Sequence, residues 1–141
     1  MIAAFPPAPI TFATIQPADA RWARYEERDD LALVEATSWL EIAPNVLEQH
    51  AALLVYAGGE LFRAILPAYL LLLVEHEYAT SLAFAVANQL ARKDSPFAQE
   101  IFEERVGPMT SEQRDVVRGA IAILAEQRLL RDAFSDALRS W

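Results

Sequence analysis

Apolar residues are densest between Leu61 and Val74, where Arg63 is the only charged side chain in the run. A helix of this length spans about 21 Å at about 1.5 Å per residue, which is shorter than the about 30 Å hydrocarbon core of a bilayer. The pattern therefore predicts a buried helix and not a membrane span. Pro67 predicts a kink, or a division into two helices. We expect Tyr69 to be buried with a partner for its hydroxyl.

Before this run, apolar positions recur at helical spacing in two segments. The first extends from Leu31 to Ile42, with Trp39 as a core anchor. The second begins at Pro44, a residue suited to the first turn of a helix, and should end before Gly58 after about three turns.

After the run, the pattern predicts three further helical segments. One extends from about Tyr78 to Arg92 and Lys93. The next begins at Asp94 or Ser95, buries Phe97, Ile101 and Phe102, and ends at Gly107. The third opens with the capping box of Thr110 and Gln113, buries Val117, Ala120, Ile121 and Leu124, and breaks near Arg128. Gly119 inside it predicts a place where another helix packs closely.

Four prolines before residue 18 exclude a continuous helix at the N-terminus and predict an extended arm over residues 1–18, with Ile10 to Phe12 as a candidate strand. The remaining residues, 19–141, are predicted to form a single domain. The fold prediction is therefore all-α, a helical bundle of about five to seven helices with a proline-rich arm.

The segment Leu66-Pro67-Ala68-Tyr69-Leu70 resembles the signature of an uncharacterised family of small bacterial helical proteins. The segments 38–42 and 109–114 are similar to two others in that family. The resemblance covers about residues 29–127. It implies a bacterial source and a helical fold, and it carries no known activity, cofactor or catalytic residue.

Charge excludes some classes of partner. Twelve basic residues against twenty acidic residues leave a net charge of −8, and the balance is −5 over residues 1–70, −4 over 71–104 and +1 over 105–141. Such a balance argues against nucleic-acid binding and favours a basic protein partner. Two clusters of acidic residues are the candidate binding surface, although solvated helix faces commonly carry such clusters. The first is Glu26, Glu27, Asp29 and Asp30, and the second is Glu100, Glu103 and Glu104.

Catalytic motifs are missing from the sequence. The absence of cysteine excludes disulfides and thiol chemistry, and the serines and glycines form no nucleophile elbow or phosphate loop. His50 and His76 do not have the spacing of two metal ligands on one helix face. We therefore assign no catalytic residue, no metal and no cofactor.

Two functions from different classes remain open. The first is a binding protein, such as an immunity protein that neutralises a cognate bacterial toxin by direct binding. The alternative is a small-ligand or metal-binding protein, or an enzyme, that uses His50, His76 and Tyr69 in a pocket between helices. A homodimer is a third possibility, because Trp141 would be exposed unless something covers it. The N-terminus has no feature of a secretory signal, and we expect a cytoplasmic protein.

Overall fold

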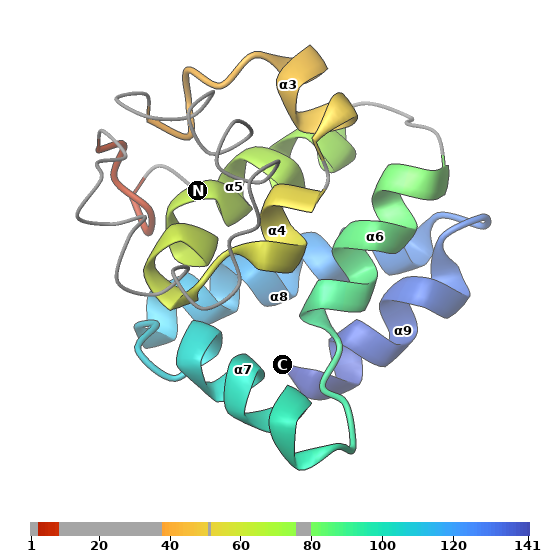
Figure 1. The fold of residues 1–141 in the computed structure, drawn as a ribbon. Helices are drawn as coiled ribbons and strands as arrows, with labels where there is room; N and C mark the ends of the chain where they lie inside the picture. The colour runs from red at the N-terminus through yellow and green to blue at the C-terminus, as the bar shows by residue number, and fades with distance from the viewer. Residues whose placement is uncertain (1–2, 9–37, 51, 76–79) are drawn as a thin grey trace.

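The most apolar run of the sequence forms helix α5 (Gly59–Glu75) at the centre of the computed structural model (Figure 1). Eleven of its 17 residues are buried. Pro67 lies inside this continuous helix, so of the two predicted outcomes, a kink or a division into two helices, the division is wrong. Tyr69 is fully buried, and its hydroxyl donates to the backbone oxygen of His50 at 2.7 Å, which confirms the predicted partner.

The structure describes residues 3–8, 38–50, 52–75 and 80–141, and it has seven α-helices and no strand over these ranges. The other six helices are α3 (Pro44–Gln49), α4 (Ala52–Tyr56), α6 (Thr80–Leu90), α7 (Pro96–Val106), α8 (Ser111–Glu126) and α9 (Arg131–Ser140). α5 contacts α3, α4, α7 and α8, while α9 packs on α6 and α8 (Figure 1). The predicted all-α fold is confirmed. No helix in the described residues is long and apolar enough to cross a membrane.

Polar side chains cap the helices where the sequence predicts. The Thr110 hydroxyl accepts the Gln113 backbone N–H at 3.1 Å, and the Gln113 side chain accepts the Thr110 N–H at 3.0 Å, which completes the capping box. Ser95 caps α7 by accepting the backbone N–H of Ala98 at 3.2 Å. The four residues predicted to form the inner stripe of α8 are all buried, and the predicted break separates α8 from α9.

The helix predicted from Pro44 to Gly58 is wrong, because the chain forms two short helices instead. α3 ends at Gln49, and His50 follows with φ −123° and ψ 45°, outside the helical region. The His50 carbonyl accepts both the Tyr69 hydroxyl and the Leu53 N–H. A long-range hydrogen bond to α5 therefore stabilises the break between α3 and α4.

The described part of the N-terminal arm, residues 3–8, is joined to the core. Ala4 and Phe5 are buried. The Phe5 carbonyl accepts the indole N–H of Trp39 at 2.8 Å, and the Ala4 carbonyl accepts the Gln113 side chain at 3.0 Å. Trp39 is buried, as predicted, although residues 38–42 form a turn and not the end of a helix. The candidate strand lies outside the described residues.

The start of α5 lies against the end of α7. A Cβ added at Gly59 would lie 2.5 Å from the backbone oxygen of Glu104. The Arg63 guanidinium donates to the backbone oxygens of Glu104 and Arg105 at 2.9 and 3.1 Å, so a side chain of α5 caps the last carbonyls of α7. Burial lowers the pKa of Arg63, and the Glu60 and Glu104 carboxylates oppose that shift.

Gly119, in contrast, was predicted to mark a close approach between helices, and the prediction is wrong. A Cβ at this position of α8 would meet nothing within 4 Å, and the residue is exposed. Glycine inside a helix loses more backbone entropy on folding than alanine does. At this position glycine therefore weakens the helix without allowing a closer contact.

The two glycines provide a matched pair of substitutions. We expect Gly59→Ala to destabilise the protein by about 1–3 kcal/mol, because the new Cβ must displace the backbone of α7. We expect Gly119→Ala to stabilise it by about 0.5–1 kcal/mol, because only the helix propensity changes. Urea unfolding of both variants measures these free energies, and changes of the same sign would contradict the described packing.

Glu41 closes the turn before α3. Its carboxylate accepts the backbone N–H of Ser38 at 3.1 Å and the Ser38 hydroxyl at 3.0 Å, and these hydrogen bonds lower the pKa of Glu41. A carboxylate whose pKa is lower in the folded state stabilises the fold above its unfolded pKa. It loses that effect as the pH falls through the folded pKa.

Glu41→Ala should therefore be less stable than the parent protein at pH 7. The difference should shrink as the pH falls below the usual glutamate pKa of about 4.3. Urea unfolding at pH 7 and pH 3 measures it. An equal difference at both pH values would mean that the charge does not contribute.

Candidate functional site

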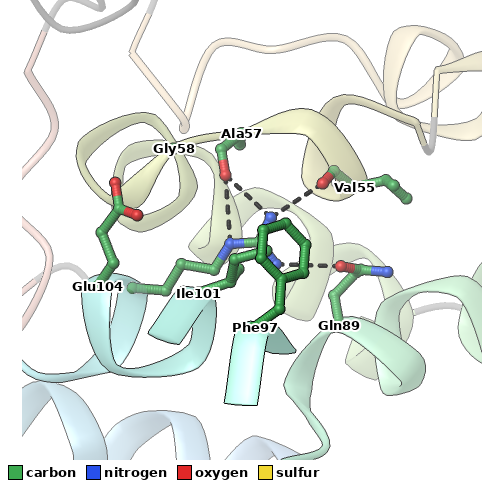
Figure 2. Close-up of a pocket in the computed structure, with 8 residues that line it drawn as sticks. Val55, Ala57, Gly58, Gln89, Phe97, Ile101 and Glu104 are labelled. Carbon is green, nitrogen blue, oxygen red and sulfur yellow. Dashed lines mark hydrogen bonds between the residues drawn. The ribbon is translucent and has the colours of Figure 1, made fainter. Parts of the chain in front are cut away.

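An apolar pocket opens between α7, the end of α4 and α6, with a volume of about 280 Å³ (Figure 2). Three positions of α7 at helical spacing, Phe97, Ile101 and Glu104, form one wall. The remaining lining residues are Val55, Ala57, Gly58, Gln89 and Arg105. Figure 2 shows that side chains from separate helices meet around this space.

Arg105 connects the helices around this pocket through hydrogen bonds. It is 5% exposed, and its guanidinium donates to the backbone oxygens of Leu54, Val55 and Ala57 at 2.9–3.2 Å. Because the last carbonyls of a helix have no partner within the helix, Arg105 caps α4 from α7. A further bond of 3.0 Å reaches the Gln89 side chain on α6 (Figure 2).

The aromatic ring of Phe62 on α5 provides another contact for this cation. The guanidinium carbon of Arg105 lies 4.6 Å from the ring centroid, a cation–π geometry that is favourable for a desolvated arginine. Arg105 therefore connects four helices. Its hydrogen bonds to carbonyl and amide oxygens give it a structural role, and we do not interpret it as an anion receptor.

Two of the large apolar side chains that line the pocket are exposed to solvent. Phe97 is 55% exposed and Val55 is 42% exposed. The sequence analysis placed Phe97 in the core, which is wrong. Its neighbour Phe102 does occupy the buried side of α7, and Ile101 is half-buried at the pocket. An exposed aromatic beside a hollow is typical of a surface that binds another molecule.

The three acidic residues that the sequence analysis proposed as a binding surface on α7 lie in different environments. Glu104 is half-buried and lines the apolar pocket, and Glu100 is exposed one helical turn earlier. Glu103 forms an ion pair with Arg92 at 2.8 Å and lines a different hollow. The structure therefore places Glu104 and Glu103 at different hollows, and Glu100 lines neither of the two.

The other acidic group, Glu26, Glu27, Asp29 and Asp30, lies outside the described residues. His76 also lies outside them, so the predicted convergence with His50 is not tested. Among the residues that the structure describes, no group of three or more histidine, aspartate or glutamate side chains could hold a metal ion. Neither of the two pockets described here is lined by His50 or Tyr69.

The side chain of Trp141 is not fully exposed to solvent. It is half-buried, its indole N–H donates to the Leu90 carbonyl at 2.8 Å, and its ring packs edge to face with Phe102 at 6.0 Å. Residues of the same chain therefore cover Trp141 in part. The homodimer stays a prediction.

Sequence reasoning missed most of the pocket. Val55 belongs to a predicted helix but carried no signal of exposure. Arg105 follows two glutamates and reads as part of a solvated helix face. The available signal was the apolar pair Phe97 and Ile101 one turn apart, which the sequence analysis assigned to the core.

Replacing Arg105 should destabilise the fold strongly. We expect Arg105→Met to lower the free energy of unfolding by about 3 kcal/mol, because it leaves buried carbonyls at the end of α4 without their donors. Arg128→Met, which removes an exposed arginine, is the matched control and should change stability by less than about 0.5 kcal/mol. Urea unfolding measures both, and equal effects would contradict the capping role.

Comparison with known proteins adds no relative: no family model matches this chain, no curated protein matches its sequence and no solved structure matches its fold. The resemblance based on residues 66–70 stays a prediction. Any function must therefore be argued from the site itself.

Proposed function

We propose that this protein binds a basic partner protein through the apolar pocket of α4, α6 and α7 and the carboxylates beside it. The observation that carries the proposal is the exposed Phe97 ring at a hollow of about 280 Å³ that Glu104 also lines. Interfaces commonly centre on a buried aromatic anchor within a rim of charged groups. Phe97 is the expected anchor in this protein.

Charge decides what kind of partner fits. The protein carries a net charge of −8, and Glu104 lines the pocket, with Glu100 one helical turn before it on α7. A partner with apolar side chains flanked by lysine or arginine would fill the hollow and be attracted by the acidic charge of this protein. A second copy of the chain in a twofold dimer would instead place the same acidic rim against itself. We therefore favour a basic partner over a homodimer.

The specific form that we propose is an immunity protein, which neutralises a basic bacterial toxin by covering its surface in a direct complex. The acidic charge and the missing catalytic motifs support this form. The alternative of a metal-binding protein or enzyme that uses His50 and His76 is not tested, because His76 lies outside the described residues.

The proposal predicts two separable kinetic effects on a purified complex with a partner recovered from the source organism. The double variant Glu100→Lys, Glu104→Lys should lower the association rate constant by about tenfold at low salt, because it reverses the attraction. Phe97→Ala should mainly raise the dissociation rate constant, because it removes the apolar anchor. Surface plasmon resonance separates the two rates.

Two matched variants control for unspecific effects. Phe84 is also an exposed phenylalanine, 47% exposed, but it does not line the pocket, so Phe84→Ala should leave both rates unchanged. Glu126→Lys reverses an exposed charge at the end of α8. Binding that is unaffected by the Phe97 and Glu100/Glu104 changes would refute this surface. A partner that is not toxic when expressed alone would refute the immunity form only.

A further inference from the structure

A second hollow lies on the other side of α7 and differs from the first in chemistry. It has a volume of about 410 Å³ and is bounded by α7, the first half of α8 and the end of α9. Three arginines line it, Arg92, Arg114 and Arg118, together with Ser111 and Trp141. Arginines from two separate parts of the chain therefore meet at one cavity in a protein whose net charge is −8.

Arg92 is held in place at one edge of this hollow. Its guanidinium pairs with Glu103 at 2.8 Å and lies 5.6 Å from the centroid of the Phe102 ring. Its backbone N–H donates to the Ser140 hydroxyl at 2.8 Å. Trp141 packs edge to face against the same Phe102 ring. Because these contacts already restrict Arg92, binding would immobilise few additional side-chain rotamers.

The two arginines of α8 lie one helical turn apart and so share a face. Arg114 donates one bond of 2.9 Å to the carbonyl of Gly107, at the end of α7. Arg118 is exposed, and it makes no hydrogen bond or ion pair with the parts of the chain that the structure describes. Cations in the first half of a helix gain nothing from the helix dipole. Within the described part of the chain, no carboxylate therefore competes with an anion for the Arg118 guanidinium.

Two side-chain carboxylates also face this hollow, Glu103 and Asp115, so its lining side chains have an excess of one positive charge. Glu103 is occupied by Arg92. The excess suits a compact anion better than a polyanion, because the charge of −8 on the whole protein would repel a nucleic acid. Guanidinium groups match the geometry of phosphate oxygens and can donate two parallel hydrogen bonds to them.

We propose that the hollow between α7, α8 and the end of α9 binds a small oxyanion, a phosphate ion or the phosphate group of a small monoester, through Arg92, Arg114 and Arg118. Ser111, the first residue of α8, adds a hydroxyl to the same lining. The site is independent of the partner-binding pocket, because it lies on the opposite side of α7 and shares no residue with it.

The test is a titration of the purified protein with inorganic phosphate and with glycerol phosphate, each against sodium chloride of equal ionic strength. The chemical shift of the Trp141 indole N–H reports the site directly, because Trp141 lines it. We expect saturable changes with a dissociation constant on the order of 1 mM. A change that sodium chloride reproduces, or one that does not saturate, would overturn the proposal.

Arg118→Gln should weaken binding about fivefold, because it removes one charge-assisted contact from an exposed position without disturbing the fold. The matched control Arg128→Gln removes an exposed arginine outside the hollow and should leave the affinity unchanged. Equal affinities for the parent and Arg118→Gln would overturn the assignment. Tighter binding of glycerol phosphate than of phosphate would identify a monoester as the ligand, and equal binding would identify the free ion.

Discussion

Hydrogen bonds from the side chains of one helix to the terminal carbonyls of another hold this fold together. Arg105 of α7 caps the end of α4, Arg63 of α5 caps the end of α7, and Trp141 donates to Leu90 at the end of α6. The helices are short, and each ends with carbonyl groups that have no partner within the helix. Long side chains with strong donors supply the missing partners and at the same time connect the helices.

The same bonds determine the chemistry of the surface. Arg105 lines the apolar pocket together with Glu104, but its guanidinium directs its hydrogen bonds to carbonyls of α4. On the other side of α7, Arg92 and the two arginines of α8 produce a hollow with an excess of positive charge. One helix thus separates the two surfaces for which we propose ligands of opposite charge.

Particular residues show where local patterns were sufficient for prediction. The capping box of Thr110 and Gln113 and the buried stripe of α8 were predictable, because their interactions lie within a few residues along the chain. Phe97 and Gly119 were misjudged, since helical spacing does not reveal whether another helix covers a given position. The break at His50 was also missed, because the Tyr69 hydroxyl that bonds its carbonyl is nineteen residues away.

The sequence by itself determined that the chain is helical, which run lies at the centre, where α7 and α8 begin, and that the protein is strongly acidic. These properties follow from composition, periodicity and capping, which act over short distances along the chain. Only the tertiary structure decided which side of α7 each glutamate faces, that Arg105 is buried, and that two hollows of different charge exist. Such features depend on contacts between residues far apart in the sequence, as for Arg63 and Glu104 or Arg105 and Leu54, and no local pattern encodes them.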